Sequence, residues 1–235
     1  MTTTELIRAA DRHFWRDAAV DSRQSFLATG NFDLAANAFG LLMVHNDDIV
    51  APGEGFDMHH HQDAEIITWV LDGALEHRDS GSAESTIVET GMAQHISAGA
   101  GVRHSEVNAA GYTSRQKVRV VQSWLPADVL GTTPSHDHHD YNDTLASGDF
   151  VQVAGPSSPL PLGVEGAALW VARLHDDLPR ELSGGAFVHF FVATGEAHVD
   201  GEHLHAGDTL RLTDAGPLKV TGSGEVLAWV MDRAV

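Results

Sequence analysis

The chain has 235 residues, 43% of them hydrophobic, so it is long enough for one large β domain or two smaller ones and is not expected to be disordered. Its 33 acidic and 14 basic residues give a formal net charge of −19, which repels nucleic-acid phosphates and anionic lipid. The sequence contains no cysteine, which excludes disulfides, thiolate metal ligands and a thiol nucleophile. We therefore expect no direct nucleic-acid or membrane binding, and any metal must use nitrogen and oxygen donors.

The amino-terminal stretch, residues 1–15, carries charges at Glu5, Arg8, Asp11 and Arg12. These charges interrupt the apolar core that a signal peptide needs. No part of the sequence approaches the roughly 18 consecutive apolar residues of a membrane helix. We expect a soluble, cytoplasmic protein.

Short apolar runs separated by turn residues fill the first half of the chain. Turn signals such as Asp72-Gly73 and Thr90-Gly91 place glycine where a positive φ is needed. Runs broken every eight to twelve residues are typical of an all-β sandwich or barrel. The segments that we predict as strands are residues 39–45, 65–71, 74–78, 85–89, 93–97, 102–107 and 118–125.

The composition changes at Pro126. From there on, the sequence contains several prolines and a polar cluster that includes His136, His138 and His139. This composition predicts a connection over the surface, with those histidines solvated. Apolar runs then resume, and the strands predicted in the second half are residues 168–174, 187–193, 196–200, 209–213, 218–221 and 226–231.

The second half weakly repeats the first. Residues 71–76 have a counterpart in 192–199, and residues 88–94 are echoed by 204–210. A repeat of this length favours two similar β-barrels in tandem. The predicted domains are residues 1–135 and 166–235, joined by a linker at 136–165.

Two short stretches hold metal-ligating residue types at a spacing of two. His59 and His61 form one pair, and His104 and Glu106 form the other. Because side chains alternate between the faces of a strand, both members of each pair point the same way, while His60 points away. On two adjacent strands they would offer three imidazoles and one carboxylate to a single ion. The alternative is that they merely line a solvated barrel mouth.

These motifs resemble the cupin superfamily and, within it, the pirin family. The residues that fit the two cupin motifs are Gly53, His59, His61, Glu65, His104 and Asn108. Segments 74–80 and 97–106 are similar to pirin sequences, and the resemblance covers most of residues 5–145. It implies an all-β protein of two tandem cupin barrels, that is, double-stranded β-helices or jelly rolls, with the metal in the first.

The resemblance also implies a ligand set. In pirin-like proteins the metal is held by residues that correspond here to His59, His61, His104 and Glu106. We expect one divalent transition metal per chain, Fe(II) in the first place, with Ni, Mn, Co, Cu and Zn as alternatives. Two positions depart from the family, because His60 stands where pirins commonly have proline and Gln62 where they commonly have a basic residue. The loss of a cation at Gln62 bears on substrate preference and redox tuning more than on metal binding.

Four further residues are candidates for orienting the metal ligands: Glu65, His77, His95 and Asn108. A carboxylate or amide that hydrogen-bonds an imidazole fixes its tautomer and ring orientation. The alternative for Glu65 is an ordinary strand residue, and for the two histidines it is a core side chain with its hydrogen bonds satisfied.

The predicted second barrel also contains histidines. His203 and His205 repeat the spacing of the first motif, and His189 and His198 lie on nearby predicted strands. Nothing corresponding to the second pair follows them. We therefore expect the carboxyl-terminal domain to lack a metal and to be structural or interfacial.

The resemblance implies an oxidoreductase similar to quercetin 2,3-dioxygenases. Such an enzyme cleaves the central ring of a flavonol with O2 and releases carbon monoxide. Glu106, or a water near it, is the expected catalytic acceptor of the substrate's hydroxyl proton. Its partners would be O2 and a small aromatic or otherwise enolisable substrate, and a monomer is the default. Other pirins contact proteins, so a redox-sensitive regulatory module that binds a basic protein partner is the alternative. Metal-assisted hydrolysis or isomerisation without O2 is a third reading.

Overall fold

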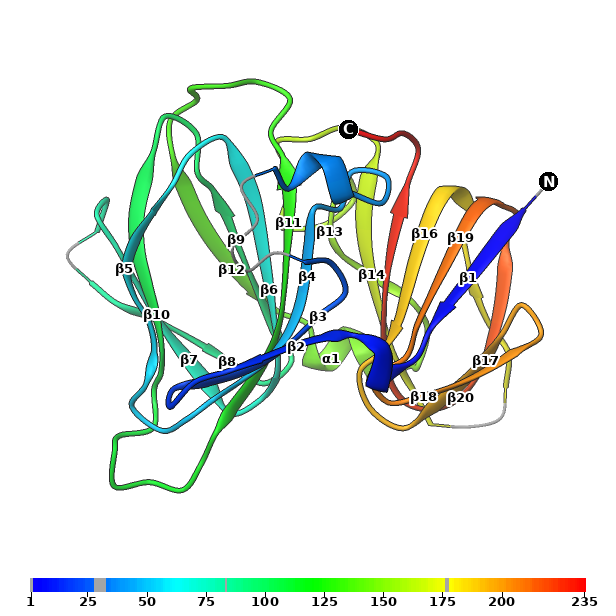
Figure 1. Ribbon diagram of the computed structural model, residues 1–235, viewed down its shortest axis with the longest axis horizontal. Coiled ribbons are helices and arrows are strands. Elements are labelled where there is room, and N and C mark those ends of the chain that lie inside the picture. Colours follow the sequence, from blue (N-terminus) through cyan, green and yellow to red (C-terminus); the bar gives the residue numbers. More distant parts are fainter. Residues whose placement is uncertain (1, 28–32, 83, 176–177) are drawn as a thin grey trace.

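A computed structural model describes residues 2–27, 33–82, 84–175 and 178–235, and it confirms the all-β class with two barrels side by side (Figure 1). The strands are β1 (Thr3–Ile7), β2 (His13–Arg16), β3 (Val20–Gln24), β4 (Val44–Val50), β5 (Gly55–His61), β6 (Ala64–Asp72), β7 (Ala74–Asp79), β8 (Thr86–Glu89), β9 (Met92–Ser97), β10 (Val102–Asn108), β11 (Val118–Pro126), β12 (Ser135–Asp140), β13 (Val151–Ala154), β14 (Ala167–Leu174), β15 (Arg180–Leu182), β16 (Gly185–Val192), β17 (Glu196–Val199), β18 (Glu202–His205), β19 (Thr209–Ala215) and β20 (Leu218–Met231). The helical elements are η1 (Ala9–Asp11), η2 (Ala35–Asn37) and α1 (Asn142–Leu145). None of these described helices is long and apolar enough to span a membrane.

Two antiparallel sheets form the first barrel. One has the order β5-β10-β7-β8 and the other the order β12-β9-β6-β11-β4-β3-β2. On β6, Ile66 belongs to one apolar cluster inside the barrel and Val70 to another, and Thr68 lies between them on the same face. The interior of this barrel is therefore apolar at two levels with a polar belt between them.

The second barrel is filled differently. Its nine-stranded sheet follows the order β1-β19-β16-β20-β14-β13, with β15, β17 and β18 attached. The buried cluster inside is wholly apolar and includes Val188, Phe190, Leu204, Leu210 and Leu212. Within the described residues, this barrel interior therefore has no group of donors for a metal, in contrast to the first barrel.

A third apolar layer joins the barrels face to face. Ile67 and Trp69 on β6 contribute to it from the first barrel, and Phe191, Leu227 and Trp229 contribute from the second. The Trp229 indole N–H donates a hydrogen bond to Ser123 Oγ on β11 at 3.0 Å, across the interface. Because both faces of β6 are covered, the site inside the first barrel has a rigid wall behind it.

The strand pairing departs from the predicted domain limits at both ends. β1 pairs with β19 from Thr3↔Thr213 to Ile7↔Thr209, so the first strand of the chain completes the second barrel (Figure 1). β12 pairs with β9, so the predicted solvated linker begins with a strand of the first barrel. β12 is an edge strand with one partner, which explains why its sequence is polar enough to be mistaken for a loop.

The predicted strand at residues 39–45 was also misplaced. The strand is β4, which starts at Val44, and Phe39 and Leu42 form only an isolated bridge. Gly40 has a φ of +59° there, a value that suits a turn rather than a strand. Leu41 and Leu42 are buried in the layer between the barrels, so the apolar run reflects packing at a turn.

Two histidines are buried between the barrels, His45 on β4 and His189 on β16, with ring centroids 4.5 Å apart. His45 Nδ1 hydrogen-bonds Ser123 Oγ at 3.1 Å, whereas neither nitrogen of His189 has a hydrogen-bond partner. Burial lowers the pKa of both rings well below 6.5; the positive charges of Arg12 and Arg211 add to this effect, as does His45 for His189. Both imidazoles are therefore neutral in the folded protein.

We expect His189→Leu to flatten the acid limb of the stability curve. Unfolding exposes an imidazole that takes up a proton below a pH of about 6.5, so the free energy of unfolding falls as the pH drops below that value. Each such histidine contributes a slope of about 1.4 kcal/mol per pH unit, which the substitution removes. Urea titrations between neutral pH and about pH 5 measure it. The exposed variant His13→Ala is the control, and an unchanged slope in His189→Leu would contradict the assignment.

Candidate metal centre

The site is built on two paired strands of the first barrel. β10 pairs antiparallel with β5, and His104 lies directly opposite His59, while Val102 lies opposite His61. Residues directly opposite each other in such a pair point to the same side of the sheet, so these histidines share the inner face. A register shift between His104 and Glu106 marks a β-bulge, a feature that re-aims side chains next to functional sites.

The four predicted ligands come together as two overlapping groups of donors. The donor atoms of His59, His61 and His104 lie within 4.8 Å of one another, and so do those of His77, His104 and Glu106. The ring centroid of His104 is 4.4 Å from that of His59 and 5.0 Å from that of His61. His104 is thus the residue that both groups share, and His77 adds a fifth donor beside the predicted four.

The state of the imidazoles fits a bound transition metal. Both nitrogens of His104 are buried and have no hydrogen-bond partner, an arrangement that is costly unless something else binds them. His59 Nδ1–H donates to the backbone carbonyl of Asp57 at 2.7 Å, which leaves Nε2 as the nitrogen with the free lone pair. His61 packs edge-on against the Trp124 ring, with centroids 4.6 Å apart. These contacts orient the rings of His59 and His61, and the nitrogens of His104 are available for coordination.

Electrostatics keep these rings neutral. Burial, followed by the neighbouring His59 and His61, lowers the pKa of His104 to about 3. Burial, followed by His59 and His60, lowers the pKa of His61 to about 4. A metal ion therefore does not have to displace protons from these two nitrogens at neutral pH.

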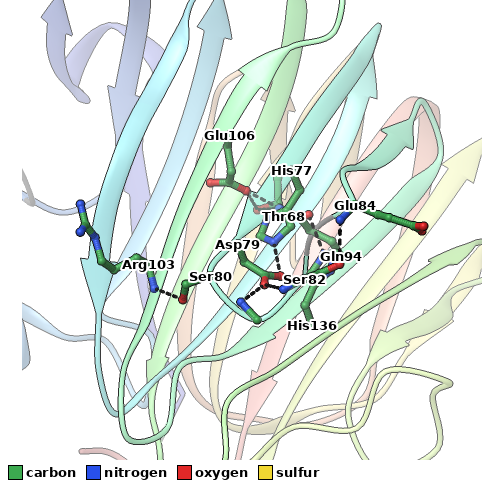
Figure 2. A network of polar contacts seen from close by, with 11 residues as sticks. Thr68, His77, Asp79, Ser80, Ser82, Glu84, Gln94, Arg103, Glu106 and His136 are labelled. Carbon is green, nitrogen blue, oxygen red and sulfur yellow. Dashed lines mark hydrogen bonds and ion pairs between the residues drawn. The ribbon is translucent and has the colours of Figure 1, made fainter.

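The Glu106 carboxylate is held by side chains from the facing sheet. Oε1 accepts hydrogen bonds from Gln94 Nε2 and, at 3.4 Å, from Thr68 Oγ1, and Oε2 accepts one from Gln122 Nε2 at 2.8 Å. Figure 2 shows Thr68 and Gln94 converging on this carboxylate. These three residues, on β6, β9 and β11, were not found from the sequence. They fix the carboxylate in one orientation, as partners of metal-binding carboxylates do.

A second polar group adjoins the first. His77 Nε2 donates to Asp79 Oδ2 at 3.1 Å, and the His77 ring stacks on His136 with centroids 3.9 Å apart (Figure 2). His136 Nε2 in turn donates to Gln94 Oε1 at 3.1 Å. His136 was predicted to lie in a solvated linker, and that prediction was wrong. His77 and Asp79 are two residues apart, as are the members of the two main pairs. This spacing could have drawn attention to Asp79.

A cavity of about 630 Å³ opens beside this second group. Its walls include His77, Asp79, Thr86, Ile96, Val102 and His136. The ring centroid of His77 is 5.4 Å from that of His104. His77 is therefore the residue that connects the cavity wall with the donor groups.

The structure places the other predicted orienting residues elsewhere. Glu65 accepts hydrogen bonds from His95 Nε2 at 2.6 Å, from Ser97 Oγ at 2.7 Å and from the backbone N–H of Gly163 at 2.9 Å. Glu65 shares a face of β6 with Ile67 and Trp69, which belong to the layer between the barrels, so Glu65 and His95 lie outside the barrel interior. Glu65 thus orients the imidazole of His95, and the described contacts give neither residue a hydrogen bond to a predicted metal ligand.

Three more positions complete the account of the motif. Asn108 Nδ2 donates to the backbone carbonyls of Val50 and Gln116 at 3.1 and 2.9 Å, so it ties the end of β10 to the end of β4 and to the segment before β11. His60 is exposed and belongs to neither donor group, as expected. Gln62 is also exposed, in the turn after β5, where it bonds Asp63.

Comparisons with known proteins agree with this architecture. The sequence model of the Pirin family matches residues 7–125. A Mycobacterium tuberculosis protein named "Putative quercetin 2,3-dioxygenase" is 39% identical over 236 residues, which cover 97% of this chain and 95% of that protein. The chain is a member of the pirin family. An Escherichia coli protein named quercetin 2,3-dioxygenase is 36% identical to this pirin over 136 residues, 57% of this chain and 55% of the relative.

Solved structures extend the likeness over the whole fold. The bacterial pirin YhhW from Escherichia coli, in complex with nickel(II), has a TM-score of 0.86 and 28% identity to this pirin. The match covers 99% of this chain and 100% of that one. The resemblance to pirins and the prediction of two cupin barrels are therefore confirmed. A relative of the same fold binds a transition metal.

Proposed function

We propose that this pirin is a metal-dependent dioxygenase that cleaves quercetin-like flavonols, or other enolisable chelating substrates, with O2. The observation that supports the proposal is a pair of donor groups, one with His59 and His61 and one with Glu106, that share His104, whose two buried nitrogens have no partner. The names of the relatives support the reaction type. Fe(II) is the metal that we propose first, and Ni(II) the next, because the related pirin YhhW is in complex with nickel(II).

The residues would divide the work as follows. His59, His61, His104 and Glu106 would hold the ion, which would acidify a bound enol and supply the redox chemistry with O2. Glu106 is anchored by Gln94 and Gln122 and would accept the proton of the substrate hydroxyl. Its neighbours keep the carboxylate oriented for that transfer.

The cavity would receive the substrate. Its volume of about 630 Å³ lies within the range of roughly 300–1,000 Å³ that is usual for pockets of small-molecule ligands. Ile96 and Val102 offer apolar contact to an aromatic ring, and the polar rim at Asp79 and His136 offers partners for hydroxyl groups. Burial of the cluster at His104 and Glu106 would limit the access of bulk water.

The test is O2 consumption and carbon monoxide release with quercetin, for apoprotein loaded with Fe(II), Ni(II) or Mn(II) in turn. Removal of an outer partner of a metal site costs roughly 10–100-fold, so loss of a direct donor in His61→Ala is expected to cost about 100-fold or more. His60→Ala is the matched control, because it removes the adjacent, exposed imidazole and should leave turnover unchanged. Absence of O2 consumption with every metal, for quercetin and for other enolisable chelators, would refute the proposal, and so would equal turnover in the two variants.

A further inference from the structure

The β17–β18 hairpin at the far end of the second barrel carries a group of histidines that the proposed reaction does not use. Its turn, Val199-Asp200-Gly201-Glu202, has φ values of +52° at Asp200 and +80° at Gly201. Two successive positive φ values in a two-residue turn are the signature of a tight hairpin with fixed register. The pairs are Glu196↔His205, Ala197↔Leu204, His198↔His203 and Val199↔Glu202.

Strand alternation sends the polar residues of this hairpin outward. Ala197, Val199 and Leu204 are fully or almost fully buried in the apolar core of the second barrel. Glu196, His198, His203 and His205 occupy the alternate positions and therefore stand together on the outer face. The second barrel thus has a histidine cluster, but on its surface rather than in its interior.

The backbone under this cluster is tied down on several sides. β17 pairs with β20 as well as with β18. Arg8 donates to the carbonyl of His203 at 3.0 Å, and the backbone N–H of His205 donates to Asp208 Oδ2 at 3.1 Å. Arg8 and Asp208 form an ion pair at 2.7 Å, so the guanidinium charge next to the hairpin is balanced.

Three donor atoms converge on this rigid support. Glu196 Oε2 lies 3.1 Å from His203 Nε2 and 3.7 Å from His205 Nδ1, and all three donors lie within 4.8 Å of one another. The His198 ring stacks on His203 with centroids 4.1 Å apart and an angle of 14° between the planes. This stacking restricts the rotation of His203 and holds its nitrogen toward the carboxylate.

We propose that Glu196, His203 and His205 form a second, surface-exposed transition-metal site, independent of the centre in the first barrel. Two imidazoles and one carboxylate, with water completing the shell, suit Zn(II), Ni(II) and Cu(II), whereas Mg(II) and Ca(II) prefer all-oxygen sites. The net charge of −19 favours the approach of a divalent cation. In Figure 1, β17 and β18 lie at the opposite end of the molecule from β5 and β10, so the two sites can be titrated separately.

The test is a calorimetric titration of metal-free protein with Zn(II) at neutral pH, repeated with Cu(II) and read by electron paramagnetic resonance. We expect two equivalents for the wild type and one for the double variant His203→Asn/His205→Asn. The reciprocal variant His59→Ala/His61→Ala should keep the hairpin equivalent and its copper spectrum. Glu196→Gln should weaken that equivalent about tenfold or more.

His13→Asn is the matched control, since it removes an exposed strand histidine elsewhere and should leave both equivalents in place. The hairpin variants change outward side chains only, and unchanged thermal unfolding of the metal-free proteins verifies that the barrel is intact. A wild type that binds a single equivalent, lost with His59 and His61, would overturn the proposal. Retention of both equivalents in the hairpin variant would overturn it as well.

Discussion

His104→Ala is expected to remove the metal from the first barrel almost completely. His104 belongs to both donor groups of the centre, so its loss leaves neither group with three donors. The pKa of its ring is lowered to about 3, chiefly by burial, so in the wild type it offers a neutral nitrogen at every physiological pH. Without His104, the remaining donors form two separate pairs, His59 with His61 and His77 with Glu106.

The measurement is metal content per chain after loading with Ni(II) or Fe(II) and gel filtration. It is best made in a His203→Asn/His205→Asn background, which removes the proposed hairpin site from the count. Occupancy should fall from about one ion per chain to less than about a tenth. Removing even a residue that only hydrogen-bonds a metal ligand lowers metal affinity roughly 10–100-fold. His138→Ala, an exposed histidine on β12, should retain full occupancy. Occupancy near one in His104→Ala would show that the ion is held elsewhere.

The main histidine cluster was predictable from strand geometry together with the resemblance to cupins. The spacing of two residues in His59/His61 and His104/Glu106 fixes which side chains share a face, whatever the neighbouring strands are. The pairing of His104 with His59 then follows from adjacency of the two strands, which the resemblance to cupins supplied. The exposed position of His60 follows from the same alternation.

The residues around the cluster were not predictable, because β6 is buried on both faces. From Ala64 to Val70 every residue is buried, so hydrophobic alternation carries no information about which face meets the barrel interior. Glu65 was given a place near the metal on motif grounds, but Thr68 occupies the inner face and Glu65 the layer between the barrels. β9 has the same property, and His95 was misplaced for the same reason while Gln94 was missed.

Long-range pairing is the second limit of sequence reasoning. β1 finds its partner β19 more than 200 residues away, and nothing in Thr3–Ile7 itself identifies that partner. Its docking closes the second barrel with the amino terminus, so each barrel depends on residues from outside its predicted domain. A local sequence pattern can indicate that a segment is a strand, but it does not indicate which sheet the strand joins.

Asp47→Ala is expected to destabilise the whole protein strongly, because it breaks a charge network buried between the barrels. Asp47 accepts two hydrogen bonds from Arg119, at 2.8 and 2.9 Å, and its carboxylate lies 3.8 Å from Arg12 Nη1. The Arg12 side chain is fully buried, and burial lowers its pKa to about 10 against the opposing effect of Asp47. Without Asp47, that guanidinium loses its nearest counter-charge in a place that water does not reach.

Removing one partner of such a buried pair costs about 3–5 kcal/mol. Arg119 also donates to the carbonyl of Ala193 at 2.9 Å, and Arg12 lies over the Phe191 ring, so the network spans both barrels and the loss should lower the stability of both together. Urea unfolding followed by tryptophan fluorescence and circular dichroism measures it. Asp21→Ala is the matched control, since Asp21 pairs with Arg16 at the surface and little change is expected. Asp47→Asn should recover part of the loss by keeping the hydrogen bonds that an amide oxygen can accept. Equal stability of Asp47→Ala and Asp21→Ala would show that the buried arginine does not depend on this carboxylate.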